Sequence, residues 1–431
     1  MEPVTTTSAT DRGTLTRRAV VGAGIATAAT AALSACGGSS GTGGDGPATL
    51  RFILSGDTTQ GGGYAAMAKK YQEQTGVVVE INDVPYDDLV TKLRNAVQAG
   101  DLPALARASS VDPLWVSALQ DLKDVATSRN VMPSLLAEDE DGQVLALPSD
   151  LTAVGLFLNK TLFDAAGVAF PTTVDDTWSW DEFVADLRQV QAAGARYGLV
   201  VDPSAHRLRS FLYEFGSRGV EENPDGTFTM NEQTAPALEY FKKLHDDGVV
   251  PTSVWLSGDD ASALFKSGQV AAYYSGVWQV TDFTQNVTDF EWVSAPLPKQ
   301  PVQATNLGTN WIVAFDGSGV EEEAKKFVDW LYTAENYAEL STVSGFLPAV
   351  EDVEVQYAAR PEAFELYNAE IAASDDICAR QVTDSIKNSY ADRGMENEPL
   401  KDEVVKYLNG EQDVATTIRR IEEATTQALS A

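Results

Sequence analysis

The chain has 431 residues, of which 44% are hydrophobic, and a formal net charge of −32 at pH 7. Its length predicts two lobes rather than one core, and its acidity argues against nucleic acid as a partner. It has two cysteines and two histidines, so neither a disulfide framework nor a cysteine-rich metal site is expected, and no motif predicts a metal ion or a cofactor.

The first 35 residues have the pattern of an export signal. Arg17-Arg18 precedes an apolar run, residues 19–33, which is shorter than the roughly 20 residues that span a bilayer. Leu33-Ser34-Ala35-Cys36 follows, and residues 36–47 are rich in glycine and serine, which predicts a flexible tether. The segment resembles a bacterial lipoprotein signal, which implies lipidation at Cys36. Both the general and the twin-arginine export routes stay open.

Beyond the tether, apolar residues alternate between the spacing of strands and the spacing of helices. The pattern predicts strands over residues 48–54, 77–81, 197–201 and 270–275. It predicts helices through residues 64–71, 89–97, 183–190, 238–244, 324–331 and 414–428, the first two ended by Gly76 and Gly100. This alternation favours an α/β class with largely parallel sheets.

Six short segments follow one another along the chain: 50–54 with 71–77, 87–93, 146–148 with 156–163, 177–183, 265–272 with 276–278, and 308–315 before the helix at 324–331. In this order they resemble the extracellular solute-binding proteins of bacterial ABC sugar importers, the branch that includes maltose-binding protein. The chain departs from the family pattern at three places. Val277 replaces a proline, Thr309 replaces a glycine, and Leu105-Ala106-Arg107 replaces Pro-Asp-Val.

The resemblance implies a two-lobed, type II-like periplasmic-binding-protein fold. Each lobe is expected to hold a mostly parallel sheet flanked by helices, with the ligand between the lobes and three hinge crossovers. We place lobe 1 at residues 48–153 plus 295–335 and lobe 2 at residues 154–294 plus 336–431. The crossovers are expected near residues 152–157, 291–296 and 333–338.

The same resemblance implies a monomeric, non-catalytic receptor, lipid-anchored on the extracytoplasmic face of the membrane, that delivers a carbohydrate to the permease subunits of an ABC importer. A receptor for another polar solute, such as a peptide, a polyamine or a polyol, stays open, and a cleft rich in carboxylates but poor in tryptophan would favour it. A secreted glycoside hydrolase with two acidic residues is the alternative from another class, although no nucleophile motif is present.

A sugar offers flat C–H faces and hydroxyl groups, which aromatic rings and planar polar side chains bind. Trp278 is expected in the cleft from its family motif. The other candidates are chosen by their positions near strand ends, in polar stretches or in the second lobe: Trp311, Asn310, Trp255, Asp112, Asp150, Ser55, Asp57, Arg207, Arg209, Glu214 and Arg380. Asp112 has an alternative role, which is to cap a helix that begins at Pro113. Trp178, Trp180 and Cys378 are expected to be buried within a lobe.

Overall fold

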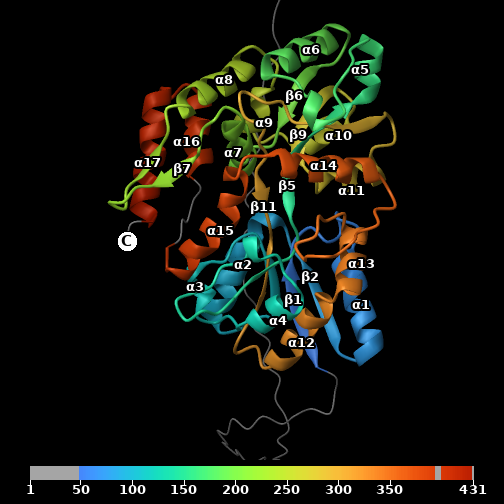
Figure 1. Cartoon of the computed structure of the whole chain (residues 1–431), viewed down its shortest axis with the longest axis vertical. Helices are drawn as coiled ribbons and strands as arrows, with labels where there is room; N and C mark the ends of the chain where they lie inside the picture. The colour runs from blue at the N-terminus through green and yellow to red at the C-terminus, as the bar shows by residue number, and fades with distance from the viewer. Residues whose placement is uncertain (1–47, 394–398, 430–431) are drawn as a thin grey trace, which may run out of the picture. The chain divides into compact units, whose positions relative to one another are not determined.

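Two mixed β-sheets organise the chain (Figure 1). The computed structural model describes residues 48–393 and 399–429, so the predicted signal peptide, Cys36 and the tether to residue 47 lie outside the described residues. No helix in the described part of the chain is long and apolar enough to cross a bilayer.

The first sheet has the strand order β2-β1-β3-β12-β4. Its strands are β1 (Thr49–Leu54), β2 (Val78–Asp83), β3 (Leu105–Ala108), β4 (Leu147–Pro148) and β12 (Trp311–Ala314). β1 runs parallel to β2 and β3, whereas β12 is antiparallel to β3 and β4. Alternate residues of β1 enter different cores, with Phe52 on one face of the sheet and Ile53 on the other.

The second sheet has the order β10-β5-β9-β6, and β11 pairs with the start of β5. Its strands are β5 (Thr152–Asn159), β6 (Tyr197–Val201), β9 (Val270–Gly276), β10 (Trp292–Ala295) and β11 (Leu307–Gly308), and β7 (Val220–Glu222) and β8 (Phe228–Met230) form a separate hairpin. Only β6 and β9 are parallel in this sheet, because β5 is antiparallel to β9, β10 and β11. The expectation of mostly parallel sheets was therefore wrong for the second sheet.

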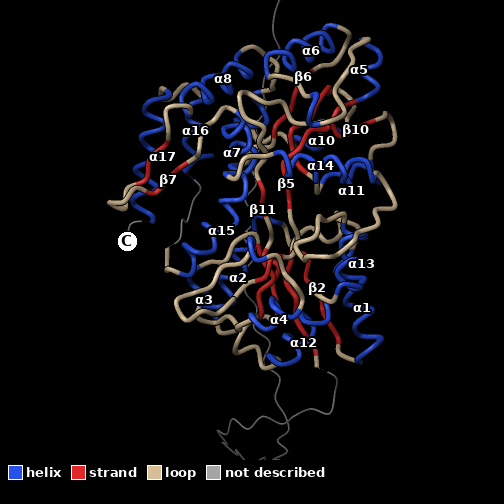
Figure 2. Tube along the Cα trace, viewed as in Figure 1, coloured by secondary structure: helices blue, strands red, loops and turns tan. Residues whose placement is uncertain are grey.

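Helices surround both sheets (Figure 2). In the first half of the chain they are α1 (Gly63–Thr75), α2 (Tyr86–Ala99), α3 (Pro113–Val116), α4 (Lys123–Ser128), η1 (Pro133–Leu135), α5 (Lys160–Ala166), η2 (Val174–Asp176), α6 (Trp180–Ala192) and α7 (Ala205–Glu214). In the second half they are α8 (Thr234–Asp246), α9 (Thr252–Leu256), α10 (Ala261–Lys266), α11 (Gln279–Asn286), α12 (Glu321–Leu331), α13 (Ala334–Ser344), α14 (Pro361–Ala373), α15 (Ile377–Tyr390), α16 (Pro399–Leu408) and α17 (Val414–Leu429).

The strands and helices predicted from periodicity are confirmed. The four predicted strands are β1, β2, β6 and β9, and the six predicted helices are α1, α2, α6, α8, α12 and α17. Gly76 and Gly100 end α1 and α2 with φ values of 80° and 68°. Glycine adopts this left-handed conformation without the steric cost that a Cβ atom would add.

The chain crosses between the two sheets several times. β5 pairs through its first residues with β11 and further along with β9 and β10, so it runs from the boundary between the sheets into the second one. After β10 and β11, the chain returns to the first sheet through β12. α13 packs against α1, beside the first sheet. We call the first sheet with its packed helices the first lobe, and the second sheet with its helices the second lobe.

Candidate functional site

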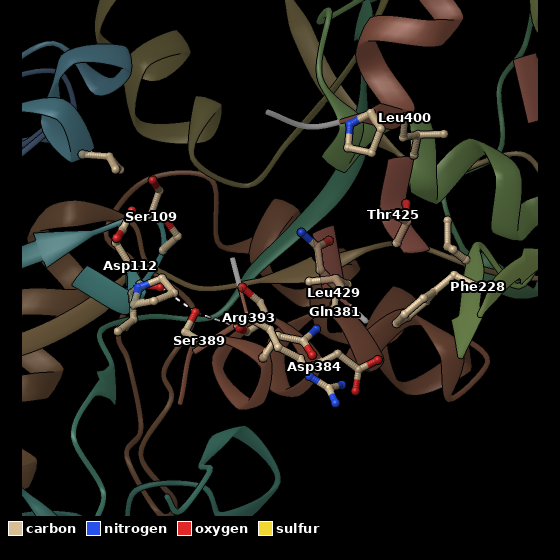
Figure 3. Close-up of a pocket in the computed structure, with 18 of the residues that line it drawn as sticks. Ser109, Asp112, Phe228, Gln381, Asp384, Ser389, Arg393, Leu400, Thr425 and Leu429 are labelled. Atoms are coloured by element: carbon tan, nitrogen blue, oxygen red, sulfur yellow. Dashed lines mark hydrogen bonds between the residues drawn. The ribbon is translucent and has the colours of Figure 1, made fainter. Parts of the chain in front are cut away.

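A cavity of about 1150 Å³ lies between the two lobes. Its first-lobe wall is α2 with residues 109–114, and its second-lobe wall comes from α7, β7, β8, α15 and α17. Figure 3 shows Ser109 and Asp112 on one side, Phe228 and Thr425 on the other, and the residues of α15 between them. Small-molecule sites usually have volumes of about 300–1,000 Å³, so this cavity accommodates a ligand larger than a single sugar ring.

Asp112 and Arg94 form the polar centre of the first-lobe wall. Residues 109–112 follow β3, whose carboxyl end reaches the same edge of the sheet as the ends of the parallel strands β1 and β2. Asp112 Oδ1 accepts the backbone N–H of Leu114 at 2.9 Å, and Oδ2 lies 2.5 Å from Arg94 Nη2. Asp112 therefore caps α3, as one interpretation predicted, and it also lines the cavity.

One face of α15 supplies the floor of the cavity. Its lining residues recur at helical spacing and are Arg380, Gln381, Asp384, Ser385, Asn388 and Ser389. Figure 1 places α15 between α7 and the pair α2 and α3, and its contacts include α3, α7 and β11. Ser389 Oγ donates to the backbone carbonyl of Val111 at 2.5 Å, which ties α15 to the first-lobe wall. Burial raises the pKa of the Asp384 carboxyl.

Arginines on the second-lobe side are held by neighbouring acidic residues. Arg380 Nη1 donates to Glu221 Oε1 at 2.8 Å, and its Nε lies 3.5 Å from Asp384. Arg393 lies 3.5 Å from Glu222. Arg209 also lines the cavity. The described lining residues thus include four arginines and three aspartates but no tryptophan, so the wall combines charged hydrogen-bonding groups with apolar side chains.

Trp278 and Arg207 lie together at the carboxyl ends of β6 and β9, outside the cavity lining. The Arg207 guanidinium sits 4.3 Å from the centre of the Trp278 ring. Asp202 Oδ2 fixes this guanidinium at 2.7 Å. The contact of Trp278 with a ligand therefore stays a prediction, and the ring face that Arg207 contacts is already occupied.

A polar network connects the cavity to the crossover strands. The Asn306 amide nitrogen lies 2.5 Å from His206 Nδ1 and 2.6 Å from Gln381 Oε1, and Gln381 lines the cavity. Burial lowers the pKa of His206 to about 3, with Arg207 and Arg209 acting in the same direction. His206 is therefore neutral near pH 7, and its Nδ1 accepts the hydrogen bond from Asn306.

Three other candidates lie inside the first lobe rather than on the cavity wall. Asp150 is fully buried beside Arg107, with 3.0 Å between Oδ1 and Nη2, and the backbone oxygen of Ser55 accepts from Arg107 Nη1 at 3.2 Å. Asp57 uses both carboxylate oxygens to accept the N–H groups of Tyr64 and Ala65 at the start of α1. The structure thus gives all three residues partners within the first lobe.

Three candidates prove to be core residues, which corrects the expectation that they face the cleft. Trp255 is 5% exposed and donates its Nε1–H to the Val201 carbonyl, because its short helix packs on the second sheet. Trp311 is 2% exposed within β12. Glu214 is fully buried, accepts from Trp180 and Tyr274, and has a pKa raised well above its usual value by burial.

The remaining predictions for individual residues have mixed outcomes. Asn310 is half-buried before β12 and does not line the cavity. Trp178 and Trp180 are buried in the second lobe, and Cys378 is buried on α15, as expected. No group of three or more His, Cys, Asp and Glu side chains within residues 48–393 and 399–429 is arranged to hold a metal ion.

Sequence reasoning missed most of the lining residues. On α2, Val90, Arg94 and Gln98 line the cavity at steps of four residues, and the polar stripe of α15 has the same kind of spacing. These periodicities are visible in the sequence. They indicate one polar face per helix, but they do not reveal that the two faces meet across the boundary between the lobes.

Comparison with known proteins places this architecture in context. Residues 66–365 match the family described as bacterial extracellular solute-binding protein. A putative binding protein of Brucella abortus is 26% identical over 325 residues, which cover 72% of this chain and 78% of the relative.

Two solved structures illustrate the similarity of fold. A cyclic α-maltosyl-1,6-maltose binding protein from Arthrobacter globiformis has a TM-score of 0.63 and 24% identity, covering 89% of this chain and 99% of that one. An ABC substrate-binding protein from Listeria monocytogenes, in complex with cycloalternan, has a TM-score of 0.71 and 21% identity over the same shares of the two chains. The predicted two-lobed α/β fold is thereby confirmed.

Proposed function

Because the chain belongs to the family of bacterial extracellular solute-binding proteins, we propose that it captures a carbohydrate between its lobes and delivers it to the permease of an ABC importer. The observation that carries the proposal is the cavity of about 1150 Å³ between the lobes, lined by amide, hydroxyl, carboxylate and guanidinium groups. Such groups bind sugar hydroxyls, often two bonds at a time. The structurally similar proteins from Arthrobacter and Listeria are a maltosyl-maltose binding protein and a complex with cycloalternan.

The lobe boundaries and hinges are part of this proposal. The pairing of β5 with β11 supports a first crossover at residues 152–157. The position of β10 in the second sheet and of β12 in the first supports a second crossover after β11, at residues 308–310, rather than near 291–296. The packing of α13 against α1 supports a third crossover after Ser344 rather than at 333–338. Ligand binding would close the lobes about these segments.

The chain is proposed to act as a monomeric receptor at the extracytoplasmic face of the membrane, anchored by lipid on Cys36. The signal-like residues 1–35 and the Gly- and Ser-rich tether support this position. Binding without catalysis is proposed because the matching family and the structurally similar proteins from Arthrobacter and Listeria are binding proteins.

A receptor for a charged polar solute is the second candidate. The described lining residues include three aspartates and four arginines but no tryptophan, and this composition favours a ligand with charged groups over a stacked sugar. The two candidates differ in the ligand class, not in the place of binding.

A thermal-shift screen separates these candidates. The folded protein would be heated with glucose, maltose, maltotriose, cycloalternan and arabinotriose, and separately with dipeptides, spermidine and glycerophosphocholine. A ligand that binds only the folded form raises the melting temperature. A carbohydrate shift that grows with concentration supports the proposal. If only a charged solute raises the melting temperature, that solute class replaces carbohydrate as the proposed ligand. If no compound raises it, both candidates are contradicted.

A further inference from the structure

One half of the Gln381 amide is used inside the protein. Gln381 lies on α15 and lines the cavity between the lobes (Figure 3). Its Oε1 accepts a hydrogen bond from Asn306 Nδ2 at 2.6 Å, whereas no hydrogen bond within residues 48–393 and 399–429 engages its Nε2. A side-chain amide has one acceptor oxygen and one NH2 group with two donors. The NH2 group of Gln381 is therefore the part left for a ligand.

Asn306 is a donor with little freedom to move. It is 0% exposed and lies directly before β11. The chain around it is bound to β5, because the Asn306 carbonyl accepts from Val154 N–H at 3.3 Å and Thr305 Oγ1 donates to the Val154 carbonyl at 2.8 Å. Such a donor fixes the orientation of Gln381, since the reversed amide would bring two NH2 groups together.

His206 fixes the orientation of the Asn306 amide in turn. Its Nδ1 lies 2.5 Å from Asn306 Nδ2, so the two N–H bonds of this nitrogen have one acceptor each, His206 Nδ1 and Gln381 Oε1. In the described part of the chain Asn306 Oδ1 has no partner. A reversed Asn306 amide would instead leave two buried N–H donors unpaired, and unpaired buried donors are rarer than unpaired buried oxygens.

The imidazole of His206 is itself confined by the crossover strand. A Cβ atom at Gly308 would lie 2.8 Å from His206 Cε1, so glycine at this position of β11 leaves room for the ring. The orientation of the cavity-lining Gln381 amide thus follows from Asn306 and His206, neither of which lines the cavity.

We propose that Gln381 binds the carbohydrate by donating from Nε2 to a ligand oxygen, and that Asn306 and His206 are positioning residues that hold the amide in this orientation. The inference rests on the proposed function and assigns a hydrogen-bond donor to the floor of the cavity. The carboxylates of Asp112 and Asp384 line the same cavity as acceptors. Donors and acceptors in one cavity complement hydroxyl groups, which accept one hydrogen bond while they donate another.

Calorimetric titration tests the role of Gln381, with maltotriose, cycloalternan and arabinotriose as separate probes. Gln381→Ala is expected to weaken the affinity roughly three- to tenfold, which is the effect of one lost hydrogen bond. Gln381→Glu keeps an oxygen for Asn306 but replaces the donor by an acceptor, so it should bind at least as weakly as Gln381→Ala. The control Gln72→Ala removes an exposed glutamine of α1, outside the cavity lining, and should retain wild-type affinity.

A double-mutant cycle tests the positioning role of Asn306. Asn306→Asp keeps the shape of the side chain but has no N–H to donate, so the Gln381 amide is expected to reverse and turn its oxygen toward the cavity. The substitution should weaken the affinity about as much as Gln381→Ala does. In the Gln381→Ala background it should cause little further loss, because its effect passes through Gln381.

The outcomes separate this inference from the proposed function. If the wild-type protein binds none of the probes, the carbohydrate function and the role of Gln381 fail together. If the wild type binds but Gln381→Ala or Gln381→Glu binds equally well, only the role of Gln381 is overturned. Losses that add in the double variant would show that Asn306 does not act through Gln381. Melting temperatures of the unliganded variants identify any loss of fold, and the two Gln381 substitutions decide the central assignment even if Asn306→Asp unfolds.

Discussion

The guanidinium of Arg107 lies 3.0 Å from the carboxylate of Asp150, with side-chain exposures of 4% and 0%. Arg107 Nε also donates to Ser149 Oγ at 3.0 Å, and its guanidinium lies 4.9 Å from the centre of the Phe346 ring. Arg107 lies in β3, and Asp150 follows β4. The buried pair joins β3 to the segment after β4 at the edge of the first sheet that faces the other lobe.

Removal of Arg107 should strongly destabilise the protein. Arg107→Met leaves Asp150 charged and unpaired in the interior, and we expect a loss of about 3–5 kcal/mol in the free energy of unfolding. Urea unfolding measures this loss of stability. Arg419→Met removes the exposed pair of Arg419 and Glu423 and serves as the control, with an expected change below about 0.5 kcal/mol. Equal effects of the two substitutions would contradict the structural role of the buried pair.

Glu370 should make stability fall as the pH rises. Burial raises its pKa to about 7 from the usual 4.5, although the carboxylate accepts from Leu297 N–H and Gln303 Nε2 at 2.7 Å each. The folded state binds the proton more tightly than the unfolded state, so the stabilisation is complete below pH 4.5 and is lost as the pH rises through 7, by roughly 3 kcal/mol.

Glu370→Gln removes this titration while keeping the size of the side chain. The urea midpoint of each protein would be measured at pH 5 and at pH 8. We expect the midpoint to fall more between these two pH values in the wild type than in the variant. Glu214, whose pKa is raised by burial and also by the charge of Glu370, is present in both proteins, and removal of the Glu370 charge reduces that second contribution in the variant. Identical pH dependence in the two proteins would show that Glu370 does not titrate as described.

Trp255 should affect stability and not ligand affinity. Its Nε1–H donates to the Val201 carbonyl at 3.1 Å, and its ring centre lies 5.2 Å from that of Phe241. Trp255→Phe loses the hydrogen bond and leaves a small void, and we expect about 1–3 kcal/mol of destabilisation. Chemical unfolding together with calorimetric titration checks both effects. Weakened carbohydrate binding with unchanged stability would return Trp255 to the binding site.

Local pattern predicted the elements near the N-terminus well. The spacing of Tyr64, Met67, Ala68 and Tyr71 and the left-handed Gly76 specify α1 without reference to the rest of the chain. Strand direction in the second sheet was not predictable in this way. The antiparallel pairing of β5 with β9 and β10 joins segments that are far apart in the sequence, such as Leu158 with Ala272 and Asn159 with Trp292, and alternation along one strand does not encode its partner.

The residues of the candidate site could likewise be predicted only in part from the sequence. Asp112 could be predicted, because an Asp-Pro step after a strand indicates both a cap and a strand end. Trp255 could not, because its short helix α9 lies in a stretch whose composition resembles a loop, and only tertiary packing buries its ring. Gln381 and Arg94 could be placed on polar helix faces from the sequence, but their meeting at one cavity depends on how the two lobes are joined.

Obstruction of the cavity tests most directly whether the solute binds between the lobes. Ser110→Trp places a bulky ring in the cavity wall, whereas Ser128→Trp places the same ring in a second cavity of about 450 Å³ between α4 and α12. Calorimetric titration with the carbohydrate that raises the melting temperature most should show at least a hundredfold loss of affinity for Ser110→Trp and wild-type affinity for Ser128→Trp. Wild-type binding by Ser110→Trp, with an unchanged fold, would place the ligand elsewhere.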